Sequence, residues 1–433
     1  MSDESILDPA AIDESGPVAA PAPRKSYPPR VPTLCRLTCQ GFEMFFSDHR
    51  DDTRMPGLIP RTIIAPWWSG VSALCGSEME KYERRLKTII GTGEFNDADQ
   101  LAVELQKAAI GWTNRLLDEL ERPEGDRALK QIFENPILIT DVREIARILP
   151  LSAALKSQLS IAFSLLAEAD QMEGLRILDL SSDTVGMLKG QYLAFVDSYG
   201  PEARYLALAL LNRMVRPWQI LMLARALSWR PNEPGSPYAE FDIVAHRLVL
   251  ELQRMGNELI DLAKSADLAS AMSQIQTRAA QYLDKAEGIA SVLVLRADSP
   301  WAETLQDTHW RLAAAFDRPF LDRVSAIVFD AERRPDPAST EASIAGAHFL
   351  ALLLEHGERF SLATAARDAT AKLANRLGDA SQSLIEAMRA SPDYSLFDGH
   401  LQALLRVTEI IFKDGPGAQL ARTMRMARQS TAA

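Results

Sequence analysis

The sequence predicts an all-α protein, either a multi-helix bundle or an irregular helical array, with a long antiparallel helical hairpin and no sizeable sheet. Two observations predict this class. Apolar residues recur every three or four positions through most of the chain, and clusters of proline and glycine separate the resulting stretches. Residues 175–180 resemble a short strand, but we interpret them as irregular or helical because an isolated strand has no partner.

Residues 1–32 form the first region of the chain. They include seven prolines, and the first 23 residues hold five acidic residues and no basic one. Such a composition buries too little apolar surface to offset the conformational entropy lost on folding. We therefore expect a disordered, acidic and proline-rich tail.

An N-terminal helical subdomain is predicted over 33–230, with an irregular, aromatic-rich start at 33–76. Three prolines between 56 and 66 oppose a long helix there, so we expect an extended segment that lies across neighbouring helices. Trp67 and Trp68 follow the last of these prolines. We interpret them as core residues, with an exposed docking or membrane-interface anchor as the alternative.

The rest of this subdomain is predicted to be helical. Ser77 and Glu80 form a capping box, which predicts that a helix begins at Ser77. The stretch 205–211 is apolar on all sides, as in a helix that its neighbours bury, and Pro217 should kink or split the run that follows. Other helices are expected at 126–133, at 141–149, and from Asn96 and Leu151 onward.

Residues 230–237 contain three prolines and a glycine and form the clearest linker, so we place the main domain boundary there. A C-terminal helical subdomain follows over 238–414 and is built on a heptad hairpin at 239–297. Later helices are expected from Ser299 onward, where serine precedes proline, and at 341–355, 362–388 and 397–411.

The hairpin is predicted from a seven-residue apolar repeat, which keeps one seam of a helix facing a partner. The step from Leu262 to Leu268 is six residues rather than seven, and Asp267 between them is a favourable N-cap. Two helices folded back on each other explain this change of phase; one bent helix is the alternative, because no proline interrupts the stretch. We expect the two arms to bury each other's seams within one subunit, in preference to an intermolecular coiled coil. The seam residues are Phe241, Ala245, Leu248, Leu252, Met255, Leu259, Leu262 and Ala266, then Leu268, Met272, Ile275, Ala279, Tyr282, Ala286, Ile289 and Leu293.

Composition excludes several classes of protein. A net charge of -11 over 433 residues argues against a general nucleic-acid binder. The most apolar stretch, 205–227, contains three arginines and is therefore not expected to span a membrane. The start of the chain lacks a secretion signal and three cysteines are too few for a disulfide framework, so we expect a cytoplasmic protein. Basic residues are mostly arginine, which suggests a GC-rich bacterial source.

Residues 415–433 are predicted to form a basic tail. Arg422, Arg425 and Arg428 recur every three residues beside apolar ones. We expect at most weak contact with anionic lipid through this tail, since three basic residues contribute little.

No motif predicts catalytic, cofactor-binding or metal-binding residues, and no cofactor is expected: phosphate-binding loops, nucleophile elbows and zinc-protease signatures are missing from the sequence. Three groups of reactive residues could form a site. Cys35 and Cys39, with Cys75 and His49, could supply metal ligands, but buried thiols explain them more simply. The other two groups are the polar loop Asp48, His49, Asp51 and Asp52, and the helical trio His348, Glu355 and His356.

Long helices without a catalytic motif favour a non-enzymatic helical scaffold or regulatory adaptor. Its partners would be proteins, which include a second copy of the chain as a homodimer. The alternatives are an enzyme or small-ligand-binding protein with a pocket between helices, and a peripheral protein weakly associated with a membrane.

Overall fold

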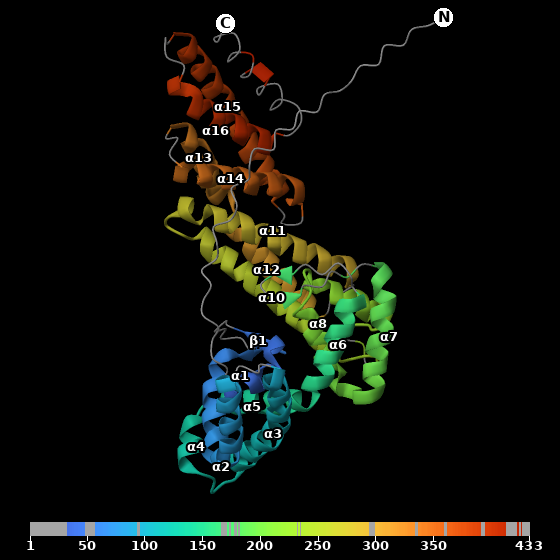
Figure 1. The fold of residues 1–433 in the computed structure, drawn as a ribbon. Helices are drawn as coiled ribbons and strands as arrows, with labels where there is room; N and C mark the ends of the chain where they lie inside the picture. The colour runs from blue at the N-terminus through green and yellow to red at the C-terminus, as the bar shows by residue number, and fades with distance from the viewer. Residues whose placement is uncertain are drawn as a thin grey trace, which may run out of the picture.

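The computed structural model describes residues 33–47, 57–92, 96–165, 182–231, 235–293, 299–333, 337–358, 362–390 and 395–412, together with 171–172, 175–176, 180, 233, 422–423 and 426. The described chain is almost entirely helical and forms an elongated array, with α1–α5 at one end and α13–α16 at the other (Figure 1). The all-α prediction is therefore confirmed. The predicted tail 1–32, the loop Asp48–Asp52 and the basic residues Arg425 and Arg428 lie outside the described residues.

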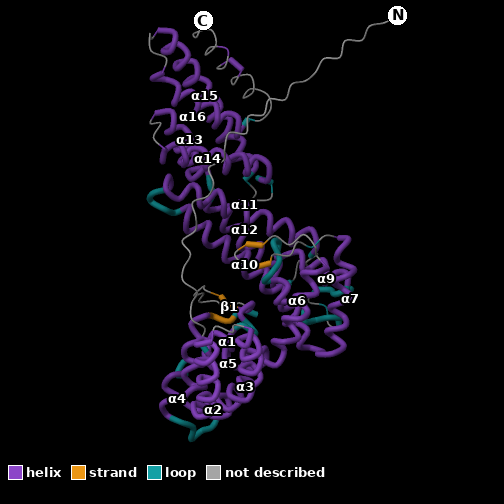
Figure 2. Tube along the Cα trace, in the orientation of Figure 1, coloured by secondary structure: helices purple, strands orange, loops and turns teal. Residues whose placement is uncertain are grey.

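The strands of the described chain are two residues long and small beside the helices (Figure 2). β1 (Phe46–Ser47) pairs in parallel with β2 (Ile59–Pro60). β3 (Gln171–Met172) pairs antiparallel with β4 (Leu175–Arg176). The interpretation of 175–180 as irregular or helical is wrong for Leu175–Arg176, which form β4. We did not predict its partner strand, which lies only a few residues upstream.

The first group of helices packs around Trp67 and Trp112, which are both fully buried. Trp67 donates its indole N–H to Thr113 at 3.2 Å, and Trp68 is half-buried, so the core interpretation of Trp67 is confirmed. The elements of this group are α1 (Leu34–Cys39), η1 (Glu43–Phe45), η2 (Arg61–Ile63), α2 (Ile64–Thr92), α3 (Asn96–Glu121), α4 (Arg127–Ile132), α5 (Pro136–Ile148) and η3 (Leu149–Leu151).

Helix α2 corrects the predicted end of the irregular start. It begins at Ile64, so the irregular start ends earlier than expected. Pro66 is tolerated because it lies in the first helical turn, where its missing N–H costs no hydrogen bond. A kink at Cys75, whose φ is -123° and ψ is 16°, divides α2 into two helical segments. The second segment begins directly after this kink, close to the start that the capping box of Ser77 and Glu80 predicts.

The next group surrounds the buried helix α8, in which every residue from Tyr205 to Leu211 is buried as predicted. α8 ends six residues before Pro217, which opens a separate turn, so the predicted split is confirmed. This group comprises α6 (Ser152–Leu165), α7 (Ser182–Tyr199), η4 (Gly200–Ala203), α8 (Arg204–Leu211), η5 (Pro217–Gln219) and α9 (Ile220–Ala226).

The predicted hairpin consists of α10 (Phe241–Ala263) and α11 (Leu268–Val292). Asp267 caps α11 by accepting a hydrogen bond from the Ser270 amide at 3.2 Å, which excludes one continuous helix. The seam residues are buried, apart from half-buried Leu262 and Ala286 and exposed Ala266 in the turn. Each arm also packs against a later helix, α10 against α12 and α11 against α14.

α12 lies along the hairpin against α10, whereas α13–α16 extend the array away from the hairpin (Figure 1). α14 lies between α11 and the helices α13, α15 and α16. We did not predict α13 as a separate helix. Its start follows Asp317, whose carboxylate accepts from the Phe320 amide at 3.1 Å and so caps it. The helices are α12 (Pro300–Ala315), α13 (Arg318–Arg333), α14 (Pro337–His356), α15 (Ala363–Ala390) and α16 (Ser395–Ile411).

The division into 33–230 and 238–414 stays a prediction. Across it, α8 packs against α10, and η5 and α9 pack against α11. Tyr192 donates a hydrogen bond to Glu240 at 3.0 Å, and Trp229 donates to Asp242 at 3.1 Å. Within the described part of the chain, no helix combines the length and apolarity needed to cross a membrane.

Candidate functional site

A hollow runs along η5 and α9. Pro217 starts this helical segment, and Trp218, Met222 and Ala226 follow at intervals of four residues, so their side chains share one face. Arg225 lies beside this stripe. α7 and the C-terminal end of α11 pack against η5 and α9 and supply the facing walls.

The hollow has two lobes, which we call the α9 groove. The first lobe has a volume of about 570 Å³ and is lined by Val185, Trp218, Met222, Arg225, Ala226, Ser291 and Val292. The second has a volume of about 440 Å³ and is lined by Leu221, Arg225, Trp229, Arg230, Pro231, Glu233, Val292 and Leu293. Arg225 and Val292 line both lobes, so the two lobes are adjacent.

A close contact between Trp218 and Gly288 fixes one wall of the groove. A Cβ atom placed on Gly288 would lie 2.2 Å from two atoms of the Trp218 ring, far inside van der Waals distance. The indole can therefore rest on the α11 backbone only because residue 288 has no side chain. The position of Trp218 thus depends on glycine at residue 288.

The end of α9 shapes the second lobe. Ser228 has a φ of 63°, and the amides of Ser228 and Trp229 donate to the carbonyls of Arg225 and Ala224 at 2.9 and 3.0 Å. These bonds are those of a Schellman motif, which reverses the chain directly after a helix. The reversal carries Trp229 and Arg230 to the groove.

The groove is apolar with a positive charge at its centre. The Arg225 side chain is exposed, and it forms no ion pair or hydrogen bond with any described residue. Arg230 pairs with Glu233 at 3.2 Å, and Lys189 donates to the carbonyl of Ala226 at 2.7 Å. A ligand with an apolar body and a carboxylate or other anionic group would complement this arrangement.

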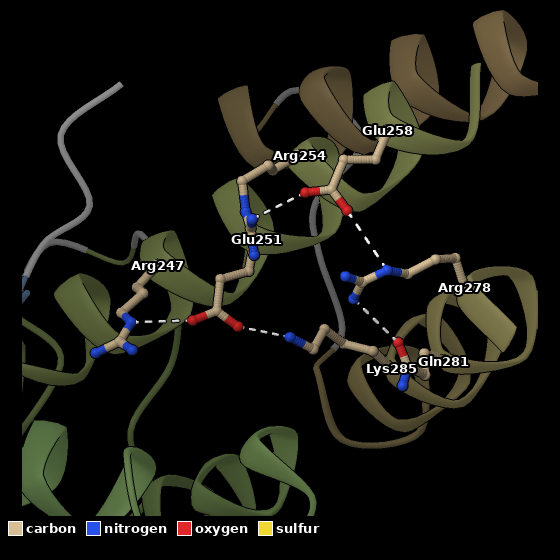
Figure 3. Close-up of polar contacts among 7 residues, drawn as sticks. All are labelled: Arg247, Glu251, Arg254, Glu258, Arg278, Gln281 and Lys285. Carbon is tan, nitrogen blue, oxygen red and sulfur yellow. Dashed lines mark hydrogen bonds and ion pairs between the residues drawn. The ribbon is translucent and has the colours of Figure 1, made fainter. Parts of the chain in front are cut away.

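A second polar cluster lies within the hairpin (Figure 3). Glu251 accepts from Arg247 at 3.1 Å and from Lys285 at 2.5 Å, and the three side chains are 14%, 6% and 14% exposed. Burial disfavours the charged form of Glu251, but Lys285 and Arg247 outweigh it and lower its pKa. This cluster joins the two arms of the hairpin.

The chain of charges continues along the hairpin. Glu258 pairs with Arg254 at 2.9 Å on the same helix and with Arg278 at 3.8 Å on the opposite arm. Arg278 also donates to Gln281 at 3.3 Å. These side chains pair among themselves and line neither lobe of the groove, so we assign them to stability rather than to binding.

The sequence-identified cysteines lie in two different places. Cys35 and Cys39 share α1, whereas Cys75 lies at the kink of α2, near Glu78 and Arg115. Among the described residues, no group of three or more histidines, cysteines and acidic residues is arranged to hold a metal. His49 and its acidic neighbours lie outside those residues, so their role stays a prediction.

The trio on α14 does not form a site of its own. His348 is exposed, whereas His356 is half-buried and its Nδ1 lies 2.8 Å from a carboxylate oxygen of Glu287 on α11. Glu355 lies farther away, 3.9 Å from His356 Nε2. This contact ties the end of α14 to the hairpin.

Sequence reasoning missed the groove residues. In the sequence, Arg225 serves only as one of the three arginines that argue against a membrane span over 205–227. The four-residue spacing of Trp218, Met222 and Ala226 nevertheless indicates that they share one helix face. Nothing in the sequence placed α7 or the end of α11 opposite that face. Comparison with known protein families, with curated proteins and with solved structures gave no match.

Proposed function

We propose that this protein is a non-enzymatic helical adaptor that binds a segment of a protein partner in the α9 groove. The main supporting observation is Arg225, an exposed guanidinium that lines both lobes and forms no ion pair or hydrogen bond with any described residue. The segment would be an amphipathic stretch with apolar side chains for the lobes and an acidic residue for Arg225.

The shape of the groove supports a peptide. The lobes lie side by side along α9, because Arg225 and Val292 line both of them, and together they are long enough in one direction to suit an elongated ligand. An amphipathic helix in a hydrophobic groove is a common way for proteins to bind peptides, with apolar anchors about one turn apart. Arginine and tryptophan are also the residues that most often dominate binding energy at interfaces.

The seam of the hairpin gives less support to a homodimer. Its apolar residues are buried within the chain, and α12 and α14 cover further faces of the two arms. Pairing two copies through this seam would have to displace helices of the same chain. The α9 groove, in contrast, is open in the single chain.

A peptide selection tests the proposal. A phage-displayed library of random peptides would be selected on the full chain alone, and each enriched peptide would then be measured for binding to Arg225→Glu. We expect enriched peptides with an acidic residue between apolar ones, and at least tenfold weaker binding to Arg225→Glu, which is about 1.4 kcal/mol. Arg311→Glu on α12, outside the groove, is the matched control and should bind as the unaltered protein does.

Two results would contradict the proposal. One is a selection without enrichment. The other is a set of peptides that binds Arg225→Glu and the unaltered protein equally well, since these would occupy a different surface.

The volume of each lobe favours a second candidate, a small amphiphilic anion. Both volumes fall within the roughly 300–1,000 Å³ of typical ligand pockets. Native mass spectrometry of protein purified without chelators would detect it as retained mass that Arg225→Glu loses. A bare chain would leave the peptide as the better candidate.

A further inference from the structure

Two thiols lie one helical turn apart on α1, at the start of the described chain. Cys35 is half-buried and Cys39 is buried, and their side chains share a hydrogen bond. The third cysteine, Cys75, has Glu78 and Arg115 as its charged neighbours and belongs to α2. Cys35 and Cys39 are therefore a pair to which Cys75 does not contribute.

The environment makes the two thiols unequal. The hydrogen bond from Cys39 lowers the pKa of Cys35, although partial burial opposes it. The same hydrogen bond, together with burial, raises the pKa of Cys39. Cys35 is thus both the more accessible sulfur and the one that ionises more readily, as expected of an attacking thiolate.

The spacing permits a bridge after a small local change. Residues four apart on a helix have Cβ atoms about 5–6 Å apart. A disulfide brings its Cβ atoms to roughly 3.5–4.5 Å. Cys39 is the last residue of α1, so the change is confined to one turn of a six-residue helix.

We propose that Cys35 and Cys39 are a peroxide-sensitive dithiol that closes to an intrahelical disulfide. The Cys35 thiolate attacks hydrogen peroxide, a sulfur–oxygen bond forms, and the oxygen–oxygen bond breaks to release hydroxide. The Cys39 sulfur then attacks the resulting sulfenic acid, the sulfur–oxygen bond breaks, and the Cys39 proton leaves with the departing oxygen as water. In total two thiols lose two electrons and one peroxide is reduced to two waters.

The neighbouring thiol of Cys39 makes the oxidation of Cys35 reversible. A sulfenic acid with a thiol beside it condenses to a disulfide before further, irreversible oxidation. Thiol reductants would then reopen the bridge. The pair therefore suits a modification that is made and removed, rather than a structural crosslink.

Peptide mapping of the full chain tests the proposal directly, because Arg36 lies between the two cysteines. Protein treated with hydrogen peroxide would be denatured, its free thiols alkylated, and the chain cleaved with trypsin. We expect residues 31–36 and 37–50 to be joined through a disulfide, with alkylation reduced from three thiols to one. Dithiothreitol should restore all three.

Single variants supply the controls. Cys35→Ser and Cys39→Ser should each abolish the linked peptide, whereas Cys75→Ser should retain it. The proposal is overturned if all three thiols stay reactive, if Cys75 enters the bridge, or if Cys35 is converted to a sulfinic acid without linkage. The circular dichroism of each variant is measured before peroxide treatment, so that a variant that does not fold is excluded.

Discussion

The Nζ atom of Lys285 on α11 lies 2.5 Å from a carboxylate oxygen of Glu251 on α10. Both side chains are only 14% exposed, so this ion pair lies inside the hairpin rather than on its surface. Arg247 donates to the other oxygen of the same carboxylate at 3.1 Å. One acid thus balances two buried bases, and this makes Glu251 the residue on which the cluster depends.

Glu251→Gln should destabilise the protein strongly. The substitution keeps the shape of the side chain but leaves Arg247 and Lys285 buried without a counter-charge, and such a loss costs about 3 kcal/mol. Denaturant unfolding followed by circular dichroism would measure it. Glu80→Gln is the matched control: its partner Arg84 is 78% exposed, and we expect a change below about 0.5 kcal/mol. Equal effects of the two substitutions would contradict the role of burial.

The same carboxylate predicts a pH dependence. The pKa of Glu251 is lowered in the folded protein, because the attraction of Lys285 and Arg247 outweighs the effect of burial. A glutamate in the unfolded chain has a pKa of about 4.3. The stabilisation by Glu251 is therefore complete above the unfolded pKa and is lost as the pH falls through the folded pKa. The difference in unfolding free energy between the unaltered protein and Glu251→Gln should be constant from about pH 7 to pH 5.5 and shrink below about pH 4. A difference that stays the same down to pH 3 would refute this reading.

Gly288→Ala should displace Trp218 from the α11 backbone. Because the added methyl would overlap the indole ring, we expect a loss of about 1–3 kcal/mol, measured by chemical unfolding. Groove-binding peptides should also lose affinity. Gly378→Ala on α15 meets no atom within 4 Å, so as a control it should raise stability by up to about 1 kcal/mol. Wild-type stability and peptide binding in Gly288→Ala would show that Trp218 can move freely.

Ser228→Gly should stabilise the chain reversal after α9. Ser228 holds a φ of 63°, a conformation that costs a residue with a Cβ about 1 kcal/mol or more and costs glycine little. We expect a gain of about 0.5–1 kcal/mol in thermal unfolding. Ser160→Gly, at an exposed position inside α6, should instead lower stability by roughly 0.5 kcal/mol. If both substitutions destabilise, the left-handed conformation of Ser228 is not a source of strain.

Local patterns in the sequence were sufficient for most of the helices. The heptad repeat and Asp267 gave the two arms of the hairpin and the turn between them, because a helix cap and an apolar face are set by residues within a few positions of each other. The same reasoning gave the buried helix α8 and the break at Pro217. It was wrong at Leu175–Arg176, where pairing with Gln171–Met172 forms a short strand.

The charge cluster and the groove depended on tertiary structure. Glu251 and Lys285 are 34 positions apart, and Trp218 and Gly288 are 70 apart, so no periodic pattern links them. Residue types alone determined where most of the helices lie and which of their faces are apolar. How those faces meet was decided by packing: a missing Cβ at Gly288 admits an indole, and the antiparallel turn brings Lys285 to Glu251. Such contacts require close fit between distant segments, which only the folded chain supplies.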